Sequence, residues 1–128
     1  MPEKQIQRSK QMVKAIIYHN PRCSKSRGSF AILEEKGFDI EEIRYLETPP
    51  SKEVLAELCQ MMNVQPLDII RTGETLFKEL ELTQNDKKTD NEWLDILVSN
   101  PQLIERPIIR IGNKAVMGRP PENILNIC

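Results

Sequence analysis

The stretch IIYHNPRCSKSRGSF, residues Ile16 to Phe30, decides the fold because two kinds of pattern meet within it. Its first residues belong to an apolar, β-branched run from Val13 to Tyr18, which predicts a buried strand. From Ser24 the spacing of apolar residues becomes helical, and Gly37 is a plausible stop. The sequence therefore predicts a strand that turns directly into a helix, with Cys23 at the junction.

The segments that follow extend this pattern toward the C-terminus. A second strand is expected over Ile40 to Tyr45 and a second helix over residues 51–62, an order that favours a layered α/β domain whose first strands are parallel. The later expected elements are helical pieces at Pro66 to Ile70, Leu76 to Leu80 and Asn91 to Ser99 (with a capping box at Thr89 and Glu92), a hairpin of Pro107 to Ile111 with Lys114 to Met117, and a helix at Pro121 to Ile127. This order predicts an α/β, thioredoxin-like fold with a helical insertion between the second helix and the C-terminal β-hairpin.

The composition limits the classes of function. The chain has 128 residues, of which 39% are hydrophobic and 29% charged, and this profile is typical of one soluble globular domain. The net charge of -1 gives no reason to expect a nucleic-acid or membrane partner. Residues 1–12 are expected to form a disordered tail with no signal peptide, and residues 13–128 a single domain. The three cysteines are too irregularly spaced for a disulfide framework or a metal site, which favours a reducing cytoplasm.

Cys23 is the candidate nucleophile. A helix N-terminus and nearby positive charge lower the pKa of a thiol and favour the reactive thiolate. Positive or potentially positive side chains surround it in the sequence, namely His19, Arg22, Lys25 and Arg27. The alternative is a buried structural cysteine, which these polar neighbours disfavour. Cys59 lies beside an apolar helical stripe and is expected in the core, and Cys128 has no expected role.

Two familiar thiol sites are excluded by spacing. A tyrosine-phosphatase loop needs C-x5-R, but Ser29 stands where that arginine is required. A dithiol exchanger needs C-x-x-C, and Ser26 occupies the second cysteine position. Cys23 is therefore expected to form an adduct that a thiol from another molecule resolves.

Three arginines stand in unusual contexts. Arg71 follows the apolar LDII, Arg106 precedes Pro107 in IERPII, and Arg119 lies between Gly118 and a pair of prolines. Taken singly, each is expected to be a solvated surface charge. Together, guanidinium groups can bind a tetrahedral oxyanion in a bidentate manner and neutralise its charge.

With these residues in view, the sequence resembles the glutaredoxin-coupled arsenate reductases, a thioredoxin-like family. The matching stretches are IIYHNPRCSKSR (Ile16 to Arg27), YLETPP (Tyr45 to Pro50), LDIIRTGE (Leu67 to Glu74), LIERPII (Leu103 to Ile109) and GRPPENIL (Gly118 to Leu125). They occur in the family's order from about Val13 to the end of the chain. The segment after Arg71, TGETLFKELEL, resembles a branch of the family whose physiological substrate is less established.

The resemblance implies a mechanism and a set of site residues. Cys23 would attack arsenate held by Arg71, Arg106 and Arg119, glutathione would act as co-substrate with no bound cofactor, and glutaredoxin would resolve the mixed disulfide. His19 matches a histidine that helps to lower the pKa of the cysteine, and Pro107 matches the cis-proline that faces the nucleophile. The other expected substrate-binding residues are Asn20, Ser24 and Arg27.

Two other functions stay open. The Spx-type regulators use the same fold to bind RNA polymerase and sense oxidation, but they usually carry a C-x-x-C switch that Ser26 removes here. A reductase acting on another oxyanion or thiol substrate is the second alternative. Retention of all three arginines favours a small anionic substrate over a protein surface.

Overall fold

The computed structural model describes residues 13–20, 22 and 24–128, with the backbone alone for residues 24 and 25. The chain divides into two compact units, one comprising Met1–Arg44 and Arg106–Cys128 and the other Tyr45–Glu105. The tail expected over residues 1–12 lies outside the described residues. The expectation of a single domain over residues 13–128 stays a prediction.

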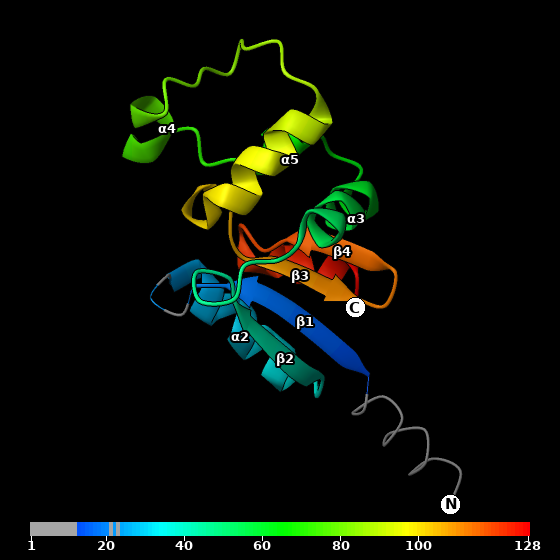
Figure 1. The fold of residues 1–128 in the computed structure, drawn as a ribbon. Coiled ribbons are helices and arrows are strands. Elements are labelled where there is room, and N and C mark those ends of the chain that lie inside the picture. The colour runs from blue at the N-terminus through cyan, green and yellow to red at the C-terminus, as the bar shows by residue number, and fades with distance from the viewer. Residues whose placement is uncertain (1–12, 21, 23) are drawn as a thin grey trace, which may run out of the picture. The chain divides into compact units, whose positions relative to one another are not determined.

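The first unit is built on a four-stranded sheet (Figure 1). Its strands are β1 (Lys14–His19), β2 (Asp39–Arg44), β3 (Ile108–Ile111) and β4 (Lys114–Met117). Their order is β2-β1-β3-β4, with β1 parallel to β2 and antiparallel to β3, and with β3 antiparallel to β4. This mixed sheet confirms the predicted parallel pairing of the first strands and the C-terminal hairpin, and the fold is thioredoxin-like.

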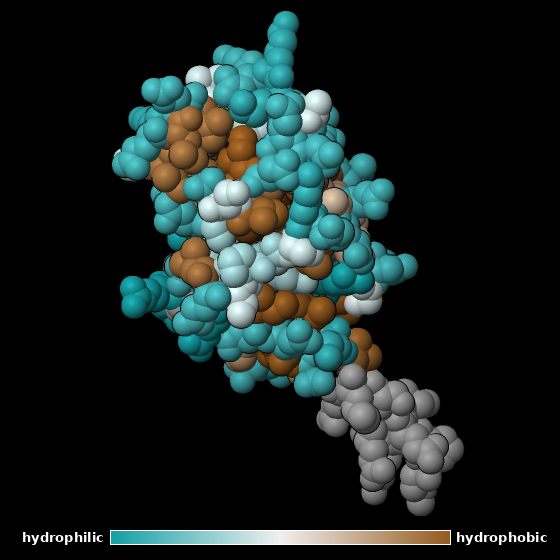
Figure 2. Space-filling view, in the orientation of Figure 1, coloured by the Kyte–Doolittle hydropathy of each residue, from teal (hydrophilic) through white to brown (hydrophobic). Residues whose placement is uncertain are grey.

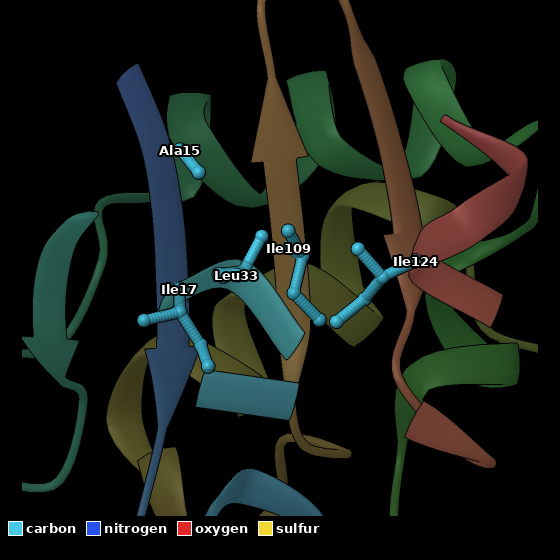
Figure 3. Close-up of a cluster of buried hydrophobic side chains, with 5 residues drawn as sticks. All are labelled: Ala15, Ile17, Leu33, Ile109 and Ile124. Atoms are coloured by element: carbon cyan, nitrogen blue, oxygen red, sulfur yellow. The ribbon is translucent and has the colours of Figure 1, made fainter. Parts of the chain in front are cut away.

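The core of the first unit lies where two helical segments pack on one face of this sheet. These segments are α2 (Ser24–Glu35) and the 3₁₀ helix η3 (Pro121–Asn126). Alternate residues of a strand point to the same face, so β1 presents Ala15 and Ile17 together. Figure 3 shows them gathered with side chains from α2, β3 and η3, and the buried cluster consists of Ala15, Ile17, Leu33, Ile109 and Ile124.

Gly37 ends helix α2, as its sequence position predicts. Its φ of 81° lies in the left-handed region, where glycine has no Cβ to clash. The backbone N–H of Gly37 donates to the carbonyl of Glu34, and that of Phe38 donates to the carbonyl of Leu33. These two bonds form a Schellman motif, which satisfies the last carbonyls of the helix and turns the chain into β2.

The second unit is helical and confirms the predicted insertion between the second helix and the hairpin. Its elements are α3 (Lys52–Met62), η1 (Pro66–Ile69), α4 (Thr75–Glu79), α5 (Asp90–Ser99) and η2 (Pro101–Leu103). The expected capping box of α5 is present, since Thr89 accepts from the backbone N–H of Glu92 and the Glu92 side chain accepts from that of Thr89. An isolated antiparallel bridge joins Ile70 to Ile104.

Cys59 lies in the core of the second unit, which confirms its sequence-based assignment. It is 5% exposed on α3, and burial raises the pKa of its thiol from 9.0 to about 11. We therefore expect a thiol reagent at pH 8 to alkylate Cys59 far more slowly than the exposed Cys128 in the folded protein. Peptide mass spectrometry over a time course measures both rates, and a sample in denaturant is the control in which they converge. Equal rates in the folded protein would contradict this placement.

The visible face of the molecule is largely hydrophilic, with apolar residues exposed in separate patches (Figure 2). The large apolar side chains that are most exposed among the described residues are Val13, Leu46, Leu80 and Leu125. Among the described helices, none combines the length and the apolar character needed to cross a bilayer.

Candidate active site

Strand register brings several of the expected site residues to one edge of the sheet in the first unit. His19, the last residue of β1, pairs with Arg44 at the end of β2. On the other side of β1, Tyr18 pairs with Ile108 of β3. Because these two strands are antiparallel, the same register places His19 opposite Pro107. Pro107 in turn faces Gly118, whose backbone N–H donates to the Pro107 carbonyl at 2.8 Å. The chain passes from β1 to α2 at this same edge, through the segment that contains Cys23.

His19 is buried against β2 and α2. It is 3% exposed, and its ring is stacked on that of Phe30 from α2, with centroids 6.2 Å apart and planes 14° from parallel. Its Nε2 atom lies 2.8 Å from Oε1 of Glu42. Its Nδ1 atom is buried and has no hydrogen-bond partner among the residues that the structure describes. Among the described contacts, the ring is therefore held through Nε2 alone.

Glu42 links His19 to the guanidinium group of Arg44. Arg44 Nε donates to the same Oε1 atom of Glu42 at 2.8 Å. The hydrogen bond from His19 and then that from Arg44 lower the pKa of the Glu42 carboxyl, so Glu42 is ionised near neutral pH. The result is a chain of charged and polar groups that runs along β2 to the histidine.

Arg106 and Arg119 occupy equivalent backbone positions on either side of the hairpin. Each directly precedes a cis-prolyl bond, to Pro107 and to Pro120 respectively. The cis bond at Pro107 confirms the expectation for this position, whereas the one at Pro120 was not anticipated. The backbone bond between Gly118 and Pro107 holds the two arginine-proline pairs side by side. The side chains of Arg106 and Arg119 thus extend from neighbouring backbone positions at the sheet edge that carries His19.

Gly118 leaves no room for a side chain. A Cβ atom built there would lie 2.5 Å from Ser29 Oγ on α2, 2.8 Å from Ile109 Cδ1 and 2.9 Å from Pro107 Cγ. Glycine therefore allows helix α2 and the proline before β3 to close tightly around the residue that precedes Arg119.

We expect Gly118→Ala to lower the free energy of unfolding by about 1–3 kcal/mol, the usual cost of overpacking a tight core. Denaturant unfolding followed by circular dichroism measures the change. Gly73→Ala is the matched control, since a Cβ at Gly73 would meet nothing within 4 Å. A Gly118→Ala variant as stable as Gly73→Ala would contradict this packing.

The residues around the candidate nucleophile are described only in part. Cys23 lies outside the described residues, as does the side chain of Ser24, although Ser24 is the first residue of α2. Ser26, three positions after Cys23, is fully buried, and within the described parts of the chain its Oγ has no hydrogen-bond partner. The Asn20 side chain accepts from the backbone N–H of Arg22 at 3.0 Å. Arg27 is exposed and donates to the Arg22 carbonyl at 3.4 Å.

Arg71 belongs to the second unit and is held by carboxylates there. Its Nη1 atom lies 3.0 Å from Glu74 Oε1, and its Nε atom lies 3.8 Å from Glu105 Oε1. Its backbone N–H donates to the Leu103 carbonyl at 2.7 Å, which anchors the residue at the end of η1. The backbone of the first unit therefore brings the positions of His19, Arg106 and Arg119 to one edge of the sheet, and Arg71 remains an expected site residue from the other unit.

The sequence reasoning missed Glu42, Arg44 and Gly118 as parts of the site. A signal for the first two is present in β2, whose sequence DIEEIR places Glu42 and Arg44 on the same face as Ile40, which packs against the core cluster. The neighbouring strand β1 ends in the only histidine of the chain, a natural partner for a carboxylate on that face. Gly118 carries no such signal, because its close contacts come from distant segments.

The described residues contain no group of three or more histidine, cysteine, aspartate or glutamate side chains that could hold a metal ion. Among the described residues, the titratable side chains in contact at the sheet edge include those of His19, Glu42 and Arg44, and Arg106 and Arg119 begin at the same edge. This set can bind an anion and move a proton.

Comparison with known proteins shows what the chain is similar to. A model of the ArsC family matches residues 18–127. The chain is 41% identical over 112 residues to the Escherichia coli K12 protein YfgD, covering 87% of this chain and 93% of YfgD. It is 39% identical over 109 residues to an arsenate reductase of Neisseria meningitidis serogroup A, covering 84% of this chain and 92% of that one. The solved structure of an arsenate reductase from Vibrio cholerae is 41% identical and superposes with a TM-score of 0.86 over 91% of this chain and 99% of that one.

Proposed function

The chain belongs to the ArsC family, and from that premise we propose that it reduces arsenate to arsenite with Cys23 as the nucleophile and with electrons from glutathione and glutaredoxin. The observation that supports the proposal is the edge of the sheet that carries His19 together with the backbone of Arg106 and Arg119. The segment that contains Cys23 enters helix α2 at that edge. Relatives named arsenate reductases, about 39% identical to this chain, support the same substrate.

The binding step follows from the charges at this edge. Arsenate is a tetrahedral oxyanion, and Arg106 and Arg119 can each donate two parallel hydrogen bonds to its oxygens. Their positive charge offsets the repulsion between the anion and a thiolate. We assign a third contact of this kind to Arg71, and contacts through shorter side chains to Asn20, Ser24 and Arg27.

The proposed reaction consists of three successive attacks by thiols. The Cys23 thiolate attacks arsenic(V), an As–S bond forms, and one arsenate oxygen leaves as water after protonation. A glutathione thiolate then attacks the Cys23 sulfur, the As–S bond breaks, and its electron pair remains on arsenic, which leaves as arsenite. Glutaredoxin attacks the glutathione sulfur of the mixed disulfide and releases Cys23. Two thiols are thus oxidised for each arsenate reduced.

The absence of a cysteine at position 26 fits this scheme, because the resolving thiol comes from another molecule. Ser26, on helix α2, instead places a buried hydroxyl three residues after Cys23 in the sequence. A hydroxyl without another partner can donate to a thiolate, and such a bond favours the charged form. The use of glutathione as reductant requires a reducing compartment, and we therefore propose the cytoplasm.

Arsenite formation by the purified chain tests the proposal. We expect turnover with arsenate, glutathione and glutaredoxin together, and only background when any one is omitted. Chromatographic separation of arsenite from arsenate with arsenic detection gives the rate directly. No arsenite above background with all three present would overturn the substrate assignment, and full turnover without glutaredoxin would overturn the proposed electron donor.

A further inference from the structure

We propose that Glu42, held by Arg44, is a positioning residue that keeps the proton of the neutral His19 ring on Nε2 and leaves Nδ1 as the proton acceptor of the site. The orientation of the ring stands on its own contacts. The use of Nδ1 to accept a proton from a thiol rests on the proposed function.

The contacts of Glu42 determine which nitrogen carries the proton. An ionised carboxylate can only accept hydrogen bonds. Its Oε1 atom lies 2.8 Å from His19 Nε2 and also receives the Arg44 Nε–H at 2.8 Å. Nε2 must therefore be the donor, because an unprotonated Nε2 would set a lone pair against a carboxylate oxygen. A neutral imidazole carries only one N–H, so Nδ1 is left with its lone pair.

The surroundings of the ring hold it in this orientation. The Phe30 ring from α2 is stacked on the His19 ring. The backbone of His19 is held by its pairing with Arg44 in the sheet. Nδ1 is buried, and the described residues offer it no hydrogen-bond partner. A buried acceptor without a partner costs free energy, so the lack of a donor among the described residues points to one in the segment between β1 and α2 or in a reactant.

A thiol is a donor that suits this acceptor. When a sulfur gives up its proton, the S–H bond breaks, an Nδ1–H bond forms, and the ring becomes an imidazolium beside the Glu42 carboxylate. The negative charge of Glu42 stabilises that cation, as carboxylates do for other catalytic histidines. The hydrogen bonds from His19 and then from Arg44 lower the pKa of the Glu42 carboxyl, so the carboxylate stays an acceptor.

The neighbouring residue on β2 supplies a matched control. Glu41 carries the same charge as Glu42, but its side chain lies on the opposite face of the strand and pairs with Lys14 at 3.2 Å. Glu41→Ala removes an equal charge from the same strand without touching the histidine.

The first test reads the tautomer directly. The chain contains one histidine, so the two ring nitrogens give unambiguous signals in a long-range ¹H–¹⁵N NMR spectrum. For the neutral ring we expect Nε2 to appear protonated and Nδ1 unprotonated in the wild type and in Glu41→Ala. In Glu42→Ala the two signals should move toward each other as the tautomers mix. A proton on Nδ1 in the wild type, or unchanged signals in Glu42→Ala, would overturn the proposal.

The second test separates positioning from substrate binding. In Glu42→Ala we expect kcat for arsenate to fall about ten- to a hundredfold, the range seen when a carboxylate that orients a metal-bound histidine is removed. The KM for arsenate should stay close to that of Glu41→Ala. If Glu42→Ala does not fold, Glu42→Gln serves, since it keeps an acceptor but not the charge and should lower kcat less. An unchanged kcat in both variants would overturn the catalytic part of the proposal. Because the NMR test needs no arsenate, a wild type without arsenate turnover would refute the proposed function and leave the ring orientation standing.

Discussion

Replacement of Cys23 by serine is expected to reduce arsenite formation to the uncatalysed background. A cysteine thiolate can attack arsenic near neutral pH, and its sulfur can then form a disulfide with glutathione. A serine hydroxyl retains the shape of the side chain but cannot carry electrons to arsenic. The rate of arsenite formation with glutathione and glutaredoxin, measured in the variant and the wild type, gives the effect.

The other two cysteines provide the controls for that result. Cys128→Ser removes an exposed thiol and is expected to retain the wild-type rate, because the nucleophile is unchanged. Cys59→Ala removes a buried thiol from the second unit and tests whether a second cysteine takes part. Turnover in Cys23→Ser at the level of Cys128→Ser would refute the assignment of Cys23.

Replacement of Arg106 or Arg119 by lysine should be the next most damaging change. Lysine retains the positive charge but loses the planar, two-pronged contact that a guanidinium makes with a tetrahedral anion. A hydrogen bond to a charged group contributes about 1.5–3 kcal/mol. We therefore expect kcat/KM for arsenate to fall about ten- to a hundredfold in each variant, since 1.4 kcal/mol corresponds to a factor of ten.

Arg110→Lys is the matched control for this pair. Arg110 lies on β3 and donates from Nε to the carbonyl of Gly112, at the opposite end of the strand from Pro107. The same substitution there should leave kcat/KM for arsenate within about twofold of the wild type. A surface substitution away from special contacts usually changes the free energy by less than about 0.5 kcal/mol. Wild-type efficiency in both Arg106→Lys and Arg119→Lys would remove these residues from the anion site.

Much of the fold was predictable because it depends on local patterns. The apolar run before Cys23, the glycine stop at Gly37 and the capping box at Thr89 each reflect a short-range physical rule, and the structure confirms them. Strands β1 and β2 are each shifted by one residue from the expected range, β3 begins one residue later, and β4 matches its range. Strand ends depend on pairing, and the pairing of His19 with Arg44 extends β1 beyond its apolar run.

The residue types of the site were easier to predict than its contacts. His19, Arg106 and Arg119 stand out by their sequence contexts, and strand register explains why they share one edge of the sheet. The bond between His19 and Glu42 depends on the register of two parallel strands, which sequence periodicity does not determine. The close approach at Gly118 and the cis bond at Pro120 depend on tertiary packing and were missed for the same reason.

The central claim is that Cys23 is a single nucleophilic thiol whose adduct is resolved by another molecule. Intact-mass and peptide mass spectrometry of the purified chain, after incubation with arsenate and glutathione but without glutaredoxin, test it most directly. We predict one glutathione per chain, bound at Cys23 and formed only when arsenate is present. A disulfide from Cys23 to Cys59 or Cys128, or a glutathione adduct that forms equally without arsenate, would contradict the claim.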